Sequence, residues 1–131
     1  MQKKDITNRE DIVLLVNAFY EKVRKNPVLG YIFDDVARID WEQHLPKMYS
    51  FWSSILLSEH SYTGNPMLTH LALSKRAPMT EVAFSEWIQL FTETVEEHFS
   101  GVNAIIAKTR AENIARLMLY KIQMDQQFIL S

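Results

Sequence analysis

The sequence predicts an all-α fold, and three observations support this prediction. Only three glycines and four prolines occur in 131 residues, so turns are few and helices long. Apolar residues recur every three or four positions, as they do on one face of a helix. Residues that cap helices, such as Thr, Asp and Asn, precede several of these stretches. We expect one domain over residues 1–131, with peripheral tails at 1–6 and 128–131.

The first helix is predicted to begin at a capping box, in which Thr7 and Glu10 each satisfy the other's free backbone N–H. It is expected to end near Pro27, because proline does not continue a helix. A turn over residues 31–35 follows and is too short for a full helix. The residues expected to be buried on the helix are Ile12, Leu15, Val16, Phe19, Tyr20 and Val23.

The second helix is predicted from Asp40, which forms a second capping box with Gln43, to about Leu57. Pro46 lies beyond its first turn and removes one backbone hydrogen bond, so we expect a slight kink or a late start. Two adjoining strips should face inward, one of Trp41, Leu45, Met48, Trp52 and Leu56, the other of His44, Met48, Phe51 and Ile55.

A polar loop over residues 58–65 should precede a short helix from Met67 to about Arg76, capped by Asn65 and started by Pro66. Thr80 is expected to cap a helix that runs through Phe99 and buries Phe84, Trp87, Ile88, Phe91 and Val95. After Gly101, a last helix over residues 102–127 should bury Ile106, Ala107, Ile114, Leu117, Met118 and Ile122.

The composition excludes several classes of protein. Because the chain has no cysteine, any metal must be held by histidine or carboxylate, and disulfides are ruled out. A net charge of −2 without a block of Lys or Arg argues against nucleic acid and anionic membranes as partners. No apolar run approaches the ~20 residues of a membrane span, and we expect no signal peptide, because no apolar stretch follows Lys3 and Lys4. We therefore expect a cytoplasmic protein, and a monomer.

Four polar or half-polar residues, Tyr20, His44, His70 and Trp87, stand beside apolar stripes on four predicted helices. Burying such a side chain unpaired costs several kcal/mol, so each needs a partner. Two histidines with a Tyr and a Trp donor nearby are well matched to a metal-centred cofactor between the helices. The simpler alternatives are a core His70 bonded to backbone, ordinary core aromatics, and a partly exposed His44.

The remaining two histidines are weaker candidates for a metal or cofactor site. His60 and His98 are interpreted as surface residues. A metal site built from His98 with Glu96 and Glu97 is disfavoured, because we interpret these residues as the solvent-exposed end of a helix.

Several motifs follow one another in a characteristic order and spacing: residues 18–20 (AFY), 26–30 (NPVLG) with Phe33, 41–52 (WEQHLPKMYSFW), 62–67 (YTGNPM) followed by His70, and 84–88 (FSEWI) with Leu90 and Phe91. In these motifs the chain resembles the group III truncated haemoglobins, over roughly residues 7–122. The family often has a histidine where this chain has Ala83.

The resemblance implies a two-over-two helical sandwich around haem b. It implies His70 as the proximal iron ligand, Tyr20 and Trp87 as distal hydrogen-bond donors, and His44 as a distal histidine that swings between pocket and solvent. The other residues expected to contact haem are Phe33, Met48, Phe51 and Phe84, with Lys47, and Lys75 or Arg76, pairing with the propionates.

Three functions remain open at this point. The leading hypothesis is binding of oxygen, carbon monoxide and nitric oxide at a five-coordinate haem iron. The second is a redox enzyme at the same haem, a nitric oxide dioxygenase or a peroxidase-like enzyme, supplied with electrons by a reductase. The third is a haem-free helical interaction domain, in which the aromatics fill the core and backbone satisfies His70.

Overall fold

The computed structural model describes residues 3–36, 38–58 and 80–130, and all regular structure within them is helical. The all-α prediction is thus confirmed for this part of the chain, while the helix predicted at 67–76 lies outside it. In chain order the elements are α1 (Arg9–Lys25), α2 (Pro27–Gly30), the π-helical turn η1 (Tyr31–Val36), α3 (Trp41–Leu56), α5 (Glu81–His98) and α6 (Val102–Leu130).

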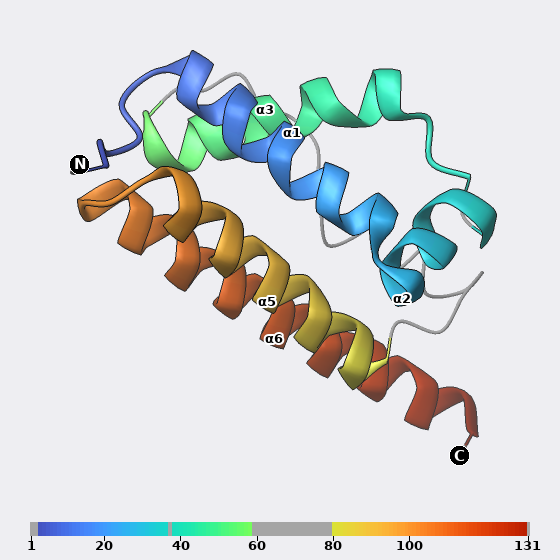
Figure 1. Cartoon of the computed structure of the whole chain (residues 1–131). Coiled ribbons are helices and arrows are strands. Elements are labelled where there is room, and N and C mark those ends of the chain that lie inside the picture. The colour runs from blue at the N-terminus through green and yellow to red at the C-terminus, as the bar shows by residue number, and fades with distance from the viewer. Residues whose placement is uncertain (1–2, 37, 59–79, 131) are drawn as a thin grey trace.

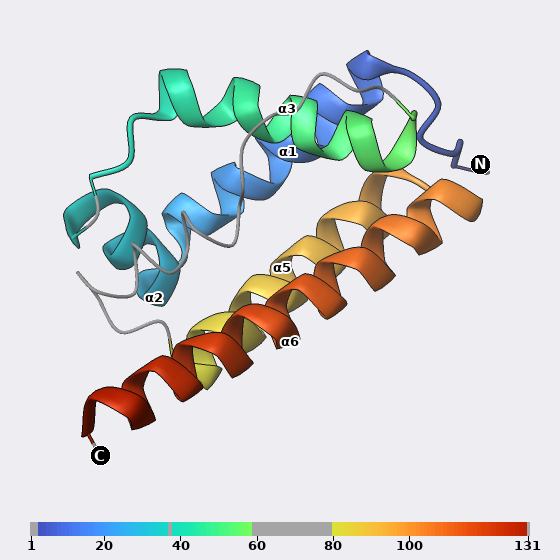
Figure 2. The same cartoon turned by 180° about the vertical axis from the view of Figure 1, so that it is seen from behind.

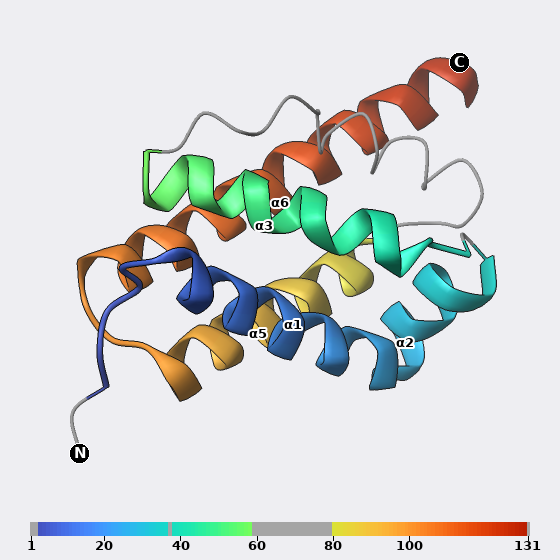
Figure 3. The same cartoon turned by 90° about the horizontal axis from the view of Figure 1, so that it is seen from above.

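The helices form two layers of two (Figure 1). Helices α1 and α3 run antiparallel in one layer, and α5 and α6 run antiparallel in the other. Seen from above, α1 lies over α5 and α3 lies over α6 (Figure 3), and the view from behind shows the same layers (Figure 2). The expected two-over-two sandwich is confirmed, and its apolar core lies between the layers.

The buried stripe of α1 is the predicted one, but its cap is not. Asn8 rather than Thr7 is the N-cap, with an extended backbone and a side-chain oxygen that accepts the Asp11 N–H at 2.9 Å. The Asp11 carboxylate in turn accepts the Thr7 N–H at 2.9 Å. The helix therefore begins one residue later than expected. Asn8 takes the capping role assigned to Thr7, and the Asp11 carboxylate satisfies the N–H of Thr7 rather than that of the cap residue.

A tight turn after α1 carries the chain into α2 and η1. The Asn26 side-chain oxygen accepts the N–H groups of Val28 and Leu29 at 2.9 and 3.0 Å and so caps α2. Gly30 packs so closely on α1 that a Cβ there would lie 2.5 Å from the Arg24 carbonyl oxygen. The chain can turn this sharply because glycine has no side chain, and Phe33 is thereby brought into the core.

Helix α3 begins at Trp41 and passes through Pro46 without the late start considered above. Asp40 caps it, as predicted, by accepting the Glu42 N–H at 3.2 Å. Of the two inward strips, His44, Met48, Trp52 and Leu56 are buried, and Trp41, Leu45, Phe51 and Ile55 are half-buried.

Helix α5 follows the prediction closely. Thr80 is its N-cap and accepts the Ala83 N–H at 3.2 Å, and Phe99 is the first residue after the helix. Phe84, Trp87, Phe91 and Val95 are buried, whereas Ile88 is half-buried. Because the side chains at these spacings share one face, α5 presents a row of aromatic rings to the core.

Helix α6 differs from the prediction in which residues it buries. Ile106 and Leu117, both expected inside, are 37% and 47% exposed. The buried face instead carries small residues, Ala104, Ala107, Ala111 and Ala115, followed by Met118. Small side chains on a buried face let a neighbouring helix approach closely, and α5 is the helix on which α6 packs most extensively.

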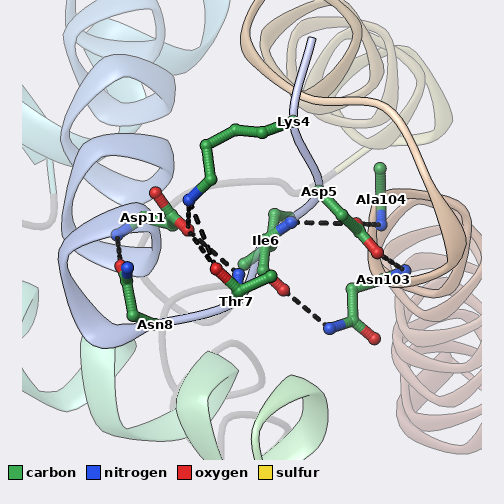
Figure 4. A network of polar contacts seen from close by, with 8 residues as sticks. All are labelled: Lys4, Asp5, Ile6, Thr7, Asn8, Asp11, Asn103 and Ala104. Atoms are coloured by element: carbon green, nitrogen blue, oxygen red, sulfur yellow. Dashed lines mark hydrogen bonds and ion pairs between the residues drawn. The ribbon is translucent and has the colours of Figure 1, made fainter.

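The N-terminal segment expected to be a peripheral tail is in fact joined to α6, as Figure 4 shows. Ile6 is fully buried. The Asp5 carboxylate accepts the backbone N–H groups of Asn103 and Ala104 at 3.0 and 2.9 Å. These N–H groups belong to the first turn of α6, which leaves them without intrahelical partners, and Gly101 has no side chain to cap them. Asp5 therefore supplies the cap from nearly a hundred residues away.

Within the described ranges, no helix is both long and apolar enough to cross a membrane.

Candidate functional site

A small apolar cavity lies between the two layers. It has room for about one molecule of the size of water. Every helix of the sandwich contributes to its wall: Phe19 and Tyr20 from α1, Met48, Phe51 and Trp52 from α3, Trp87 from α5, and Ile114 and Met118 from α6. The cavity is therefore a product of how the layers pack and of no single element.

Tyr20 lines this cavity and carries a hydroxyl group. Its oxygen lies 3.2 Å from Nε2 of His44 on α3, and both side chains are buried. Burial raises the pKa of the Tyr20 phenol well above its ordinary value, so the group stays protonated and remains a donor. With the imidazole proton on Nδ1, Tyr20 donates to His44. With the proton on Nε2, His44 donates to Tyr20, and the phenolic hydrogen is available to a third group.

Trp87 also lines the cavity and carries a second hydrogen-bond donor. Its indole nitrogen is buried and has no hydrogen-bond partner among the described residues. The ring is held by aromatic packing, stacked on Phe91 at 5.9 Å and 10° and meeting Phe19 edge-on at 5.5 Å. Leaving a buried N–H unpaired costs about 1–3 kcal/mol. A site that tolerates this cost at a cavity wall is suited to a ligand that accepts the hydrogen bond.

The structure brings together several of the residues that the sequence singled out. Tyr20, Met48, Phe51 and Trp87 line the cavity, and His44 reaches it through its hydrogen bond to Tyr20. The alternative that His44 is a partly exposed helix residue is wrong, because it is 8% exposed.

Other predicted site residues lie elsewhere or outside the described ranges. Phe33 is buried behind the cavity, with its ring 6.4 Å from Tyr20 and 6.2 Å from Trp41. Phe84 is buried and lines a shallow pocket between α5 and α6. Lys47 is exposed on α3. His70, Lys75, Arg76 and the surface candidate His60 all fall within 59–79, outside the described residues.

His98 stands at the last turn of α5 and is exposed, as expected. Among the described residues no group of three His, Asp or Glu side chains is placed to hold a metal ion. The weak metal site considered for His98 with Glu96 and Glu97 is therefore not present in the part of the chain that the structure describes.

Sequence reasoning did not assign four of the cavity residues to the site: Phe19, Trp52, Ile114 and Met118. All four belong to predicted apolar stripes, but a stripe marks only the side of a helix that is buried. Which buried residues border a cavity depends on how neighbouring helices meet, and periodicity carries no signal for that.

Comparisons with known proteins identify the family. Residues 4–123 match the family model of bacterial-like globins. The chain is 35% identical over 125 residues to Group 3 truncated hemoglobin ctb of Campylobacter jejuni, an alignment covering 91% of this chain and 96% of that protein. The crystal structure of group III truncated hemoglobin from Campylobacter jejuni matches with a TM-score of 0.79 at 33% identity, covering 93% and 95% of the two chains.

The chain belongs to the group III truncated haemoglobins. The resemblance seen in the sequence is thus confirmed, and membership of a globin family implies that the protein binds haem.

The described residues fit one face of a haem group. The wall of aromatic and aliphatic side chains around the cavity suits the apolar face of a porphyrin. Two of the lining residues also carry polar groups, the Tyr20 hydroxyl and the Trp87 N–H, and the latter has no partner among the described residues.

Proposed function

We propose that this truncated haemoglobin binds haem b and holds oxygen, carbon monoxide or nitric oxide in the cavity between its layers. The observation that carries the proposal is the buried indole N–H of Trp87, which has no partner among the described residues. A polarised diatomic ligand that accepts this hydrogen bond removes the penalty of about 1–3 kcal/mol. The Tyr20 hydroxyl, kept protonated by burial, is the second donor.

The family pattern indicates which residues would hold the haem. His70 would ligate the iron, Phe33, Met48, Phe51 and Phe84 would surround the porphyrin, and Lys47 with Lys75 or Arg76 would pair with the propionates. When bound through one neutral imidazole, haem iron keeps an open position for a gas. The protein's own contribution is a dry cavity with donors in fixed positions, which strengthens each hydrogen bond formed there.

The haem assignment is tested by His70→Ala. We expect the variant to lose most of its haem, because no other histidine is assigned as the proximal ligand. The measurement is the ratio of Soret to protein absorbance after loading with haem. His98→Ala removes an exposed histidine and serves as the control, with unchanged loading expected. Normal loading and an unchanged ferrous spectrum of the His70 variant would contradict the assignment.

The role of Tyr20 is tested by Tyr20→Phe, which removes one hydroxyl and keeps the ring. We expect the oxygen off-rate to rise at least about tenfold, the equivalent of ~1.4 kcal/mol. Tyr49→Phe, which removes a hydroxyl bonded to Asn17 on the outside of the same two helices, is the matched control. Stopped-flow displacement of oxygen measures both, and an unaltered rate in Tyr20→Phe would show that its hydroxyl does not contact the ligand.

The hydrogen-bonded pair of Tyr20 and His44 favours a second use of the same pocket. A donor beside a group that can exchange protons assists reactions of oxygen as well as its retention. We propose nitric oxide dioxygenation or peroxidase-like turnover, with a reductase supplying electrons, as this alternative. Oxygen consumption with added nitric oxide and a reductase tests it, and turnover no faster than that of free haem would reject it.

Membership of a globin family argues against the third hypothesis, a haem-free helical interaction domain. A Soret band after haem reconstitution would exclude it, and a colourless protein would favour it.

A further inference from the structure

Tyr20 faces two different spaces. One is the inner cavity, and the other is an open groove on the outside of α1 and α3. The groove is also lined by Asn17, Glu21, Arg24, Lys25, Asp34, Trp41, Leu45 and Tyr49. A single phenol ring therefore stands between the proposed haem pocket and solvent.

Trp41 is the aromatic neighbour of Tyr20 on the groove side. The two ring centroids are 5.3 Å apart, which is contact distance for aromatic rings. Trp41 is half-buried and lines the groove, so it is reachable from solvent. Tyrosine and tryptophan are the aromatic side chains most easily oxidised by one electron, and here they stand in sequence from the inside to the outside.

Each ring also has a proton acceptor in place. The Tyr20 hydroxyl lies 3.2 Å from His44 Nε2, and the Trp41 indole N–H donates to Oδ1 of Asp34 at 2.8 Å. A phenol or an indole is far easier to oxidise when its proton can leave with the electron. The Arg24 guanidinium lies 5.1 Å from the centre of the Trp41 ring and disfavours a positive charge on it, and its Nε also donates to Oδ2 of Asp34 at 3.2 Å.

We propose that Tyr20 and Trp41 form a path that carries single electrons from solvent to the haem pocket. The inference rests on the proposed haem binding. The oxidant is hydrogen peroxide reacting in that pocket, and the reductant is a small phenol that reaches Trp41 from the groove. The path would supply electrons to peroxide turnover and would also protect the pocket from oxidative damage.

The transfer balances in three steps. Tyr20 loses an electron to the oxidant in the pocket and its hydroxyl proton to His44, which leaves a neutral phenoxyl radical. Trp41 then returns an electron to Tyr20, His44 returns the proton, and the indole proton of Trp41 moves to Asp34. Finally a phenol gives Trp41 an electron and releases its own proton, and Asp34 returns the indole proton. The peroxide oxygens take up one proton from water for each electron, which balances the proton that each phenol releases. Two passes therefore convert one peroxide and two phenols into two waters and two phenoxyl radicals.

A competing route exists inside the core and must be separated by the test. Trp87, Phe91 and Trp52 are stacked in a row, with ring centroids 5.9 and 4.9 Å apart. This row also begins at the cavity, but Trp52 is buried, at 4% exposure. A radical that formed there would have no contact with a reductant in solution. We therefore assign Trp41 as the residue that receives electrons from the reductant.

The test uses the haem-loaded ferric protein, with ring-deuterated tryptophan, mixed with hydrogen peroxide and freeze-quenched for electron paramagnetic resonance. In the wild type we expect a tryptophan radical whose signal narrows on deuteration. Trp41→Phe, which keeps a ring against Phe33, should abolish that signal and leave a tyrosyl radical. Tyr20→Phe should lower the yield of the tryptophan radical at least about tenfold, because the relay to Trp41 is broken.

Two further variants make the result specific. Asp34→Asn retains an acceptor for the indole N–H but takes up no proton, so the Trp41 radical should be lost or decay at least about tenfold faster. Tyr49→Phe changes another tyrosine of the groove and should leave the radical unchanged.

A tryptophan radical that persists in Trp41→Phe and disappears in Trp52→Phe would overturn the proposal in favour of the inner row. Normal Soret absorption and oxygen binding without any tryptophan radical would overturn this inference and leave the proposed function intact. Failure to bind haem would overturn both.

Discussion

At the scale of single residues, Trp87 and Tyr20 differ in how their polar groups are satisfied. Tyr20 has an internal partner in His44, whereas the indole N–H of Trp87 is buried without one among the described residues. A ligand that accepts from Trp87 gains a new hydrogen bond at no cost to an existing one. A ligand that accepts from Tyr20 must use a hydrogen that His44 also attracts. We therefore expect Trp87 to contribute at least as much to ligand retention as Tyr20.

This comparison predicts the behaviour of Trp87→Phe. We expect the oxygen off-rate to rise at least about tenfold, and that of carbon monoxide to rise less, because carbon monoxide is less polarised. Stopped-flow kinetics on the haem-loaded protein measure both rates. Trp52→Phe removes the same indole volume from the same cavity wall and is the matched control. Equal effects of the two variants on both gases would show that volume, and not the N–H group, is responsible.

At the scale of elements, the first turn of α6 depends on a residue of the N-terminal segment. Asp5 accepts N–H groups that Gly101 cannot satisfy, and Gly101 itself has a φ of 138°, a conformation that other residues rarely adopt. A Cβ at Gly101 would also lie 2.6 Å from Cγ of Asp5. The glycine and the aspartate therefore form one joint, which ties the start of α1 to the turn between α5 and α6.

The joint predicts a pH-dependent stability. Burial alone would raise the pKa of Asp5, but the hydrogen bonds from Asn103 and Ala104 lower it below the ordinary value of 3.8. A carboxyl group whose pKa is lower in the folded state stabilises the fold above the unfolded pKa, and this contribution is lost as pH falls through the folded pKa. Asn103 and Ala104 donate to different oxygens of Asp5, and an amide keeps only one of them. Asp5→Asn should therefore lower the free energy of unfolding by about 1 kcal/mol near neutral pH, and by less below pH 3.8.

Urea unfolding at several pH values measures this difference. Asp35→Asn, which changes an exposed aspartate in η1, is the control and should give a small difference at neutral pH. A difference between wild type and Asp5→Asn that stayed constant from neutral pH to pH 3 would show that the carboxylate charge is not what caps α6.

At the scale of the whole molecule, the helix faces buried between the two layers differ in the size of their side chains. Helices α1, α3 and α5 present large aromatic and aliphatic side chains, while α6 presents mainly alanine. The aromatic rings leave a cavity where they meet, and the alanines allow α6 to come close enough for Ile114 and Met118 to close it. Large residues of α6 such as Leu117 are left at the surface.

This arrangement predicts that the volume of a side chain, and not its hydrophobicity, limits which residues fit on the buried face of α6. Ala111→Leu should lower the free energy of unfolding by about 1–3 kcal/mol, because a fully packed interface has no room for the added carbons. Leu117→Ala removes a larger apolar group but should change the free energy of unfolding by no more than about 0.5 kcal/mol, because the side chain is half exposed. Thermal or urea unfolding compares the two variants, and the opposite order would mean that Leu117, and not Ala111, faces the core.

Much of this structure was predictable from local patterns. The stripe of α1, the caps Asp40 and Thr80, and the aromatic face of α5 were all predicted and are confirmed, because each depends on residues within a few positions of one another. The motifs also indicated the family, and four of the predicted site residues line one cavity. The structure differs from the predictions in the choice between the neighbouring caps Thr7 and Asn8 and in which residues of α6 are buried, because apolar residues surround that helix. It also differs in the N-terminal segment, which was expected to be a peripheral tail.

The sequence by itself determined that the chain is helical, where most helices begin, and which polar residues lie beside apolar stripes, because helix formation and capping are local. Tertiary structure alone decided that Asp5 caps α6, that alanine forms the inner face of α6, and that Tyr20 separates a cavity from a groove holding Trp41. These outcomes depend on distances between elements far apart in the chain, which packing sets and no local pattern records.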